Sequence, residues 1–454
     1  MEQNAKKPRT KRVLAILAAA ACVAVAALAV LPLLKPTPVG ASGAIAEASY
    51  PPMEKCPERA DYADELAYTD AYFRWLQNRT VRQELPSDFR GGEFFQRSCA
   101  EFLTGAANEN RVYSPVNVYM ALSMLAEVTD GNTRAQLLSL LGADSLDALH
   151  EQAGALWNAS YCDDGALTSV LANSFWLSGD IRYNAETAER LAQYYYASSF
   201  SGKMGSAEYN ALLQNWLNKQ TGGLLSEQVK GVEMTPDTVL ALASTVYFKA
   251  GWLEKFDAAA TASDIFHTPA GDVTADFMHK TTANGTVYTG EGCTAVREAM
   301  EGGCAMWLIL PDADTTADAL LESGAALDLA LSSEPQTRRA TVNLDMPNFD
   351  VCSDLDLIEG LQTLGVTEVF DAGTADFSPL TQEARALAVT KAEHAARVTV
   401  DEEGCTAAAY TVILAEKMAM PAREIVDFTL DRPFVFVITG AASQPLFVGV
   451  VNQP

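Results

Sequence analysis

A run of twelve residues near the C-terminus, Gly404–Ala415 (GCTAAAYTVILA), constrains this chain more than any other stretch. The run contains no charged residue and no proline, and three carboxylates, Asp401, Glu402 and Glu403, precede it directly. A β-strand is permitted here, because proline, which removes a ladder hydrogen bond, is absent. Most of the side chains are nevertheless too small to fill a core. The fold must therefore accommodate a segment that can pair as a strand but contributes little packing.

The N-terminus indicates export from the cytoplasm. Five basic residues between Lys6 and Arg12 precede an uncharged stretch from Val13 to Leu34, which is typical of a signal peptide and long enough to span a bilayer. Residues 1–35 are interpreted as a signal peptide or an N-terminal membrane anchor, and both alternatives stay open. Residues 36–60 are rich in Pro, Ala and Gly, as in a linker. Residues 61–93 are predicted to be a helical N-terminal extension, and the compact domain is expected to occupy residues 94–454.

Composition and motifs exclude several classes of function. A formal net charge of −26 argues against nucleic-acid binding, which normally requires a basic surface. No hydrolase, zinc-protease, phosphate-loop or dinucleotide motif is present, and only four histidines could supply a catalytic or metal site. Neither an enzyme nor a bound metal or cofactor is expected. The eight cysteines show no C-x-x-C spacing, which favours buried reduced thiols over a disulfide framework.

The order of patterns along the chain predicts an α+β fold, with helices first and strands later. Phe95, Cys99 and Phe102 fall on one helix face, Ser114 is suited to cap a helix that begins at Pro115, and another helix should run from Asn132 to Gly142. Strands are predicted at 304–310, 340–346 and 388–400, with His394 on the buried face of the last, and two more in the C-terminal tail.

Six blocks together resemble the serpin family over residues 94–454. They are VYSPVNVYMALSMLAEVTDGNTRAQLLSLLG, LASTVYFKAGWLEKF, MPNFDV with LQTLGVTEVF, ADFSPLT, VTKAEHAARVTVDEEGCTAAAYT, and DRPFVFVI with LFVGVVNQP. The resemblance implies one domain with three β-sheets, eight or nine helices and an exposed reactive-centre loop. It also implies a suicide inhibitor of serine or cysteine proteases. Loop insertion into the central sheet is the family's own mechanism, and a general example of strand addition and stored strain.

The resemblance gives the bland run a role, because a solvated loop that later becomes a buried strand cannot carry charge or bulk on its inward face. The implied hinge consists of Glu402, Glu403, Gly404, Cys405, Thr406, Ala407, Ala408 and Ala409. The implied inward face consists of Cys405, Ala407, Ala409, Thr411, Ile413 and Ala415, which leaves Tyr410 on the solvent face.

The family's spacing places the reactive bond seventeen residues into the loop, counted from Glu402. This count predicts Met418–Ala419, and targets with elastase-, chymotrypsin- or subtilisin-like pockets. A shift of one residue would make Lys417 the specificity residue and imply a trypsin-like target. Arg423 would require a longer loop.

A polar cluster beneath the sheet is also implied, made of Ser114, Asn117, Ser244 and His394. The family usually has Ser where Asn117 stands and Asn where Ser244 stands, so the two residues are hypothesised to exchange partners within the cluster. Trp252 resembles the family's tryptophan near the point of insertion. Cys405 replaces the usual Thr or Ser at the first inserting position.

The expected partner is a target serine protease in a covalent complex, and the protein is expected to be a monomer outside the cytoplasm, either secreted or anchored and facing outward. Heparin activation is not expected, because no Lys or Arg occurs between Arg134 and Arg182, where the family's basic helix should lie. The alternative is a non-inhibitory serpin that acts as an extracellular binding protein.

Overall fold

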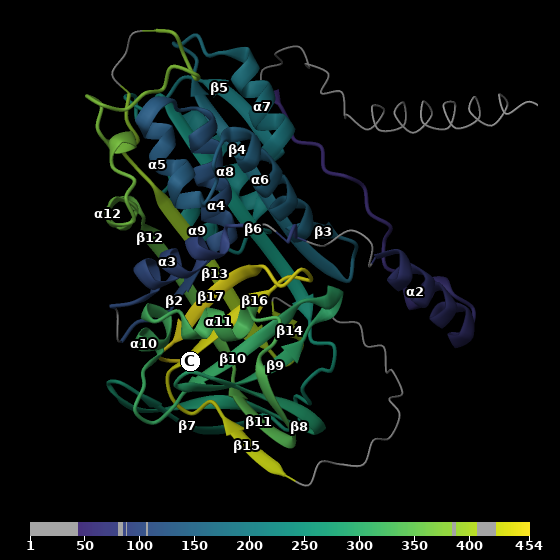
Figure 1. The fold of residues 1–454 in the computed structure, drawn as a ribbon. Coiled ribbons are helices and arrows are strands. Elements are labelled where there is room, and N and C mark those ends of the chain that lie inside the picture. The colour runs from purple at the N-terminus through teal and green to yellow at the C-terminus, as the bar shows by residue number, and fades with distance from the viewer. Residues whose placement is uncertain (1–43, 80–84, 88, 106–107, 384–386, 406–423) are drawn as a thin grey trace, which may run out of the picture.

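The computed structural model describes residues 44–79, 85–87, 89–105, 108–383, 387–405 and 424–454 (Figure 1). Within these ranges no helix has both the length and the apolar character needed to cross a bilayer. The interpretation of residues 1–35 as a leader or anchor lies outside the described residues.

The first sheet has eight strands in the order β1-β5-β4-β6-β14-β13-β12, with β3 paired to β4. Its strands are β1 (Ala44–Ala46), β3 (Cys162–Asp163), β4 (Leu167–Ser178), β5 (Ala197–Gly202), β6 (Leu240–Gly251), β12 (Phe349–Asp356), β13 (Glu393–Asp401) and β14 (Gly404–Cys405). β4 and β6 pair antiparallel from end to end, whereas β4 and β5 are parallel. β14 is the shortest of the central strands, and it lies between β6 and β13.

The second sheet has nine strands in the order β15-β11-β8-β9-β10-β16-β17-β2, with β7 paired to β8. Its strands are β2 (Arg111–Tyr113), β7 (Ala262–Thr268), β8 (Gly271–Gly290), β9 (Cys293–Ala299), β10 (Ala305–Pro311), β11 (Gln336–Pro347), β15 (Ile425–Thr429), β16 (Phe434–Thr439) and β17 (Pro445–Val451). The first part of β8 pairs with β7 and its last part with β9. Because β8 continues through both parts, two of the three expected sheets form one hydrogen-bonded network.

The described residues contain eleven α-helices and three short 3-10 helices. They are α2 (Glu65–Arg79), α3 (Gly92–Leu103), α4 (Pro115–Glu127), α5 (Gly131–Leu141), α6 (Leu146–Ser160), α7 (Ala185–Tyr195), α8 (Ala207–Gln220), α9 (Ser226–Val229), α10 (Ala317–Glu322), α11 (Ala325–Leu331), α12 (Ile358–Thr363), η1 (Arg59–Asp61), η2 (Glu301–Gly303) and η3 (Glu368–Phe370). The expected count of eight or nine is exceeded because α2 belongs to the N-terminal extension and α9 is a single short turn. The α+β class is confirmed.

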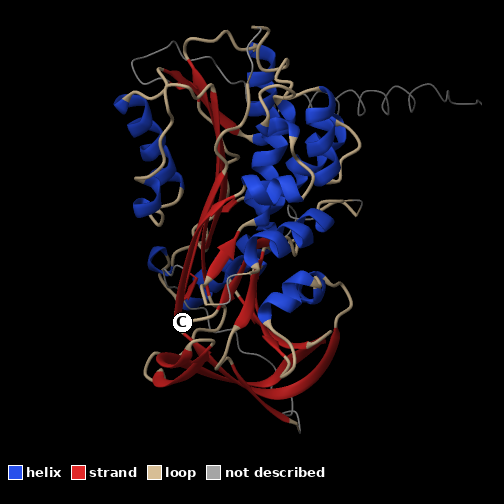
Figure 2. Cartoon of the chain, turned by 90° about the vertical axis from the view of Figure 1, so that its left-hand side faces the viewer, coloured by secondary structure: helices blue, strands red, loops and turns tan. Residues whose placement is uncertain are grey.

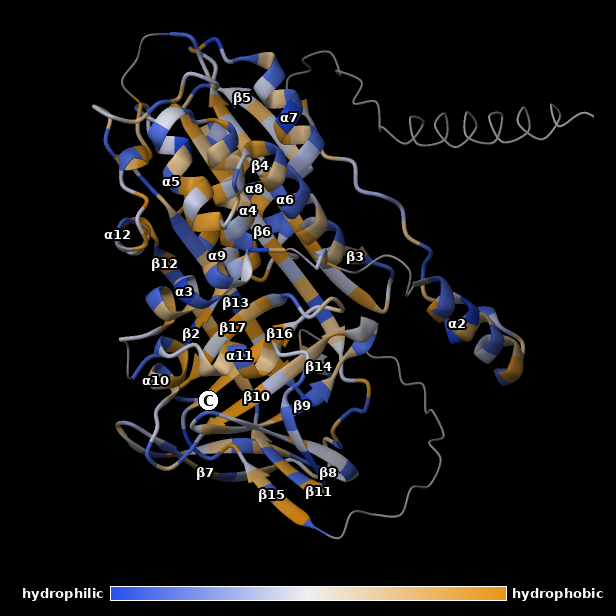
Figure 3. Cartoon of the chain, in the orientation of Figure 1, coloured by the Kyte–Doolittle hydropathy of each residue, from blue (hydrophilic) through white to orange (hydrophobic). Residues whose placement is uncertain are grey.

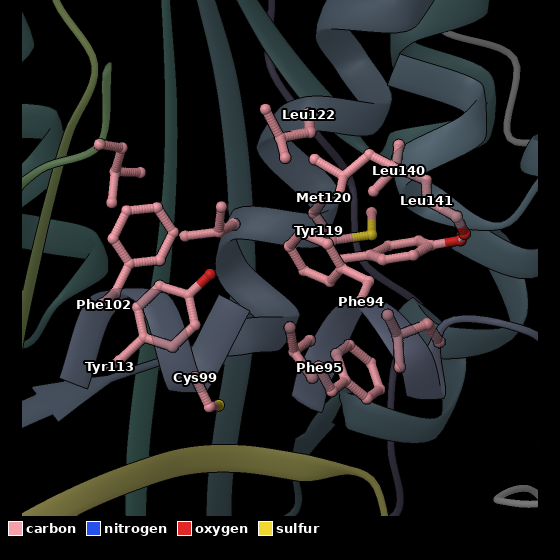
Figure 4. Packing of buried hydrophobic residues seen from close by; sticks show 14 of the residues in the cluster. Phe94, Phe95, Cys99, Phe102, Tyr113, Tyr119, Met120, Leu122, Leu140 and Leu141 are labelled. Atoms are coloured by element: carbon pink, nitrogen blue, oxygen red, sulfur yellow. Dashed lines mark hydrogen bonds between the residues drawn. The ribbon is translucent and has the colours of Figure 1, made fainter. Parts of the chain in front are cut away.

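Helices lie on both sides of the eight-stranded sheet (Figure 2). On one side, the rings of Phe94 and Tyr119 meet at 5.7 Å within the largest buried cluster (Figure 4). On the other side, α8 covers the sheet with Leu213 and Trp216, which pack against Trp176 of β4. The first sheet is therefore covered on both faces.

In the second sheet, the strands β10 and β16 are hydrophobic along most of their length and fully buried (Figure 3).

Most local predictions are confirmed. Ser114 caps α4 and its side chain accepts a hydrogen bond from the amide of Asn117. α5 begins at Gly131, one residue earlier than predicted, and ends at Leu141, where Gly142 caps it in the left-handed conformation. The strand predicted at 388–400 is shorter, because β13 begins only at Glu393.

Residues 36–60 were predicted to be a linker, but their described part packs against the compact domain over much of its length. β1 pairs with β5, and the amide of Ala48 donates to the Ser198 hydroxyl at 2.9 Å. The Tyr50 ring packs 5.6 Å from Trp157. The cause is the free edge of β5, which accepts an additional strand.

Candidate functional site

The chain turns sharply after β13 and returns as β14 into the middle of the first sheet. β14 is antiparallel to both of its neighbours. Gly404 and Cys405 face Gly251 and Ala250 of β6 on one side, and Asp401 and Val400 of β13 on the other. The first two residues of the uncharged run are therefore already strand residues.

The tight turn between β13 and β14 follows from two residue types. The Asp401 carboxylate accepts hydrogen bonds from the amides of Glu403 and Gly404 at 2.9 and 3.1 Å, as short Asp side chains commonly do in turns. Gly404 has a φ of 150°, and a Cβ atom there would lie 2.4 Å from the Ala250 carbonyl oxygen. Only glycine allows the backbone to approach β6 this closely.

Trp252 fastens the turn from the end of β6. Its indole nitrogen donates to the Asp401 carbonyl at 2.8 Å, and its amide donates to the Glu403 carbonyl at 3.0 Å. The side chain is 1% exposed, and its ring meets Phe256 edge-on. Trp252 lies where the resemblance places it, beside the hinge, and there it satisfies carbonyl groups of the turn.

Both hinge glutamates have specific partners. The Glu402 carboxylate accepts from the Thr261 hydroxyl at 2.6 Å and from the Asn348 amide at 3.4 Å. The Glu403 carboxylate forms an ion pair with Lys255 at 2.6 Å. The hydrogen bond from Thr261 lowers the pKa of Glu402 below its ordinary value of 4.5. The turn is therefore stabilised most when the Glu402 carboxylate is ionised.

This pKa shift predicts how stability should change with pH. Because the Glu402 pKa is lower in the folded than in the unfolded chain, its contribution is complete above pH 4.5 and is lost as the pH falls through the folded pKa. Glu402→Gln should cost up to about 1 kcal/mol of unfolding free energy at pH 7, since the group is partly exposed to solvent, and the cost should shrink as the pH falls from 5 to 3. Urea unfolding of both proteins at pH 7, 5 and 3 measures this, and a difference independent of pH would contradict it.

The structure describes the hinge only as far as Cys405, whose side chain is 2% exposed and packs in the same buried cluster as Trp252 and Val400. The remaining predicted loop residues lie outside the described residues. They are Thr406, Ala407, Ala408, Ala409, Thr411, Ile413, Ala415, Lys417, Met418 and Ala419.

The four residues of the predicted polar cluster lie together between α4 and the first sheet. The Ser114 amide donates to Nε2 of His394 at 3.0 Å, and the Asn117 side-chain amide donates to the Ser244 carbonyl at 2.9 Å. Burial lowers the pKa of His394 to about 4. The ring is therefore neutral at pH 7, and its Nε2 atom can accept the hydrogen bond from the Ser114 amide. The cluster joins the start of α4 to both strands that flank β14.

The hypothesis that Asn117 and Ser244 exchange side-chain partners needs correction. Asn117 bonds the main-chain carbonyl of Ser244, and the Ser244 hydroxyl has no hydrogen-bond partner within the described part of the chain. The physical reason is reach: the Asn117 amide spans the distance from the helix to the strand backbone, and no side chain at position 244 is required.

This correction gives a prediction that opposes the exchange hypothesis. Asn117→Ala should lower the unfolding free energy by about 1–3 kcal/mol, because it leaves a carbonyl of low exposure without a partner. Ser244→Ala should change it by less than about 0.5 kcal/mol, and the double variant should be additive. Denaturant unfolding of the three variants measures these effects. A double variant that loses less unfolding free energy than the sum of the two single variants would restore the exchange hypothesis.

In the part of the chain that the structure describes, β6 and β13 are not paired with each other, and β14 alone pairs with both of them. We call the space between β6 and β13 beyond the end of β14 the slot. A cavity of about 20 Å³, enough for one water molecule, lies in this slot. Its lining includes Asn117, Val246 and His394 toward the core, and Leu225, Thr245 and Ala395 toward α8.

Sequence reasoning missed three residues that hold the hinge, namely Lys255, Thr261 and Asn348. All three are distant in sequence from their glutamate partners, so no local pattern marks them. The turn at Asp401 carried a readable signal, an Asp three residues before a Gly. Among the described residues no cluster of three or more His, Cys, Asp or Glu side chains could hold a metal ion.

Comparisons with known proteins agree on one family. The family model described as "Serpin (serine protease inhibitor)" matches residues 92–454. Serpin-Z2A of Oryza sativa subsp. japonica is 30% identical, with 77% of this chain and 92% of that protein covered. Alpha-1-antitrypsin 1-4 of Mus musculus is 29% identical, with 80% and 88% covered.

Solved structures share the fold at lower identity. Tengpin, a thermophilic serpin in its native state, superposes with a TM-score of 0.72 at 22% identity, covering 82% of this chain and 96% of tengpin. Thyroxine-binding globulin in complex with thyroxine gives a TM-score of 0.69 at 21% identity, covering 80% and 98%.

Proposed function

The chain belongs to the serpin family, and from this premise we propose that it is a suicide inhibitor of serine endopeptidases, with cysteine endopeptidases as the alternative target class. Members of this family are generally inhibitors rather than catalysts. In the proposed reaction the protease nucleophile attacks the carbonyl of the reactive bond. An acyl-enzyme forms, the new amino terminus leaves with a proton, and the freed loop inserts between β6 and β13 before water can hydrolyse the ester.

The register of β14 supports this proposal. Each step along the loop from Gly404 corresponds to one step back along β6 from Gly251. Continued for twelve residues, the register places Ala415 opposite Leu240, so the uncharged run Gly404–Ala415 matches the twelve residues of β6. Cys405 points inward, and alternate residues after it, Ala407 to Ala415, would then also point inward.

The slot would gain a complete strand. About a dozen ladder hydrogen bonds at roughly 0.5–1.5 kcal/mol each amount to about 10 kcal/mol, comparable to the stability of an ordinary domain. The single observation that carries the proposal is β14 itself: Gly404 and Cys405 enter the sheet between β6 and β13, which are not paired with each other within the described residues.

For the reactive bond we propose Met418–Ala419, with Lys417 as the alternative specificity residue. The corresponding targets are elastase-, chymotrypsin- or subtilisin-like proteases, or trypsin-like ones for Lys417. We further propose that residues 1–35 export the protein as a signal peptide or anchor it to the membrane facing outward. Residues 36–60 would connect them to the extension at 61–93 and the serpin domain at 94–454.

A non-inhibitory binding function is the second candidate, favoured by the fold shared with thyroxine-binding globulin. Incubation with elastase-, chymotrypsin-, subtilisin- and trypsin-like proteases distinguishes the two. The inhibitor should form a covalent complex that survives SDS, and the mass of the released C-terminal peptide locates the bond. Cleavage without any complex would favour the binding protein.

A further inference from the structure

A groove lies between α3, α5 and the turn that follows α12, which are on the same side of the molecule (Figure 1). Its volume is about 290 Å³, enough for about ten water molecules, whereas the cavity in the slot holds one. None of the residues that line this groove belongs to the hinge or to the polar cluster. The proposed inhibition therefore makes no use of it.

The two long walls of the groove are tied to each other. One wall is a single face of α5, because its lining residues recur at intervals of three and four. They are Asn132, Ala135, Gln136, Ser139 and Leu140. The side-chain oxygen of Gln136 accepts hydrogen bonds from the amides of Thr367 and Glu368 at 2.9 and 3.0 Å. The Thr133 hydroxyl donates to the Glu368 carboxylate at 3.1 Å. These contacts fix the second wall, residues 364–368, against α5, so the groove is preformed.

Arg97 of α3 lines the groove with a guanidinium group whose donors are only partly used. Its Nη2 atom donates to the Leu364 carbonyl at 3.4 Å, and its Nη1 atom lies 3.9 Å from the Glu93 carboxylate one turn away. Both distances are long for such contacts. Glu93 is also 80% exposed, so water weakens this ion pair. A guanidinium group carries five N–H donors in a planar fork that matches a carboxylate. Arg97 can therefore bind an anion in the groove.

Two leucines line the groove together with Arg97. Leu140 is 5% exposed and Leu364 is 9% exposed. A Cβ atom on the neighbouring Gly365 would meet no atom within 4 Å, so the space beside Leu364 is open. A ligand can place its carboxylate on the fork of Arg97 and cover the leucines with an apolar body. The combination of one cation with apolar side chains selects for an anion that has such a body.

We propose that this groove is a binding site for a small carboxylic acid with an apolar body. Arg97 binds the carboxylate through its fork, and the exposed hydroxyl of Ser139 supplies a further donor. The apolar body of the acid packs on Leu140 and Leu364. This site does not depend on cleavage of the reactive loop or on its insertion.

Fluorine NMR of para-fluorobenzoate with the full chain tests the site. The natural sequence should bind the acid saturably in the millimolar range. It should bind para-fluorobenzyl alcohol, which has the same ring without the charge, at least about tenfold more weakly. Arg97→Gln should weaken binding of the acid at least about tenfold, and Arg97→Lys, which keeps the charge but not the fork, about threefold. Ala135→Phe, which fills the groove and leaves Arg97 in place, should abolish binding.

Arg74→Gln is the matched control, because Arg74 is an exposed arginine on α2, away from the groove (Figure 1). This variant should keep the affinity for the acid within about twofold of the natural sequence. Absence of saturable binding, equal binding of acid and alcohol, or unchanged affinity in Arg97→Gln would overturn the assignment. Equal losses in Arg74→Gln and Arg97→Gln would also overturn it, because they would show a general effect of net charge.

Discussion

Ala409→Arg is expected to turn the proposed inhibitor into a substrate. In the proposed inserted strand, the continued register would place position 409 between Val246 and Ala396 on the core side of the slot. Ala396 is 3% exposed, and Asn117 lies at the cavity beneath. An arginine there would bury an unpaired charge, which costs several kcal/mol even after relaxation. Insertion would stall after cleavage, and water would hydrolyse the acyl-enzyme.

The measurement is the stoichiometry of inhibition together with the yield of SDS-stable complex. We expect the yield to fall at least about tenfold. A change of 1.4 kcal/mol in the relative barriers of loop insertion and acyl-enzyme hydrolysis already gives that factor. Thr411→Arg, on the same face, should behave alike. The matched control is Thr406→Glu, because the continued register would turn position 406 outward between Lys249 and Thr399 in the proposed inserted strand. The control should stay within about threefold of the natural sequence. Full inhibition by Ala409→Arg would contradict the assigned inward face.

Gly404→Val is expected to expel β14 from the sheet. The added Cβ would lie 2.4 Å from the Ala250 oxygen and 2.7 Å from the Gly251 Cα atom. Both are backbone atoms of β6 and cannot rotate away. The φ of 150° adds strain for a β-branched residue. Loss of the strand pairs and of the Cys405 burial should lower the unfolding free energy by about 2–4 kcal/mol.

A second glycine provides the control for this prediction. Gly271 also has a positive φ, 130°, but a Cβ there meets no atom within 4 Å. Gly271→Val should therefore show the backbone strain alone, about 1–2 kcal/mol. Denaturant unfolding compares the two variants, and Gly404→Val should also reduce the yield of protease complex. Equal losses of stability would show that β14 contributes nothing beyond the conformation of its glycine.

Local patterns predicted the parts of the site that depend on strand and helix geometry. The alternation from Ala388 to Val400 placed His394 on the buried face, and the structure has it 4% exposed. The Ser-Pro pair placed the start of α4 correctly. These features depend only on near neighbours in the chain.

Contacts between distant segments were not predictable in the same way. The partner of Asn117 proved to be a backbone carbonyl, which no side-chain pattern encodes. Thr261 reaches Glu402 across 141 positions of sequence, and this contact depends on how the two sheets pack. The docking of β1 was missed because Ala44–Ala46 carries no strand pattern of its own. It pairs because the neighbouring edge of β5 is available.

Thermal unfolding of intact and loop-cleaved protein tests the central claim most directly, namely that residues 404–415 can become a central strand of the first sheet. The cleaved protein should melt roughly 10–20 °C higher, because about 10 kcal/mol of new pairing is gained in a domain of this size. Identical melting temperatures would mean that no strand was added. The chain would then have the architecture of its family without the stored energy that inhibition requires.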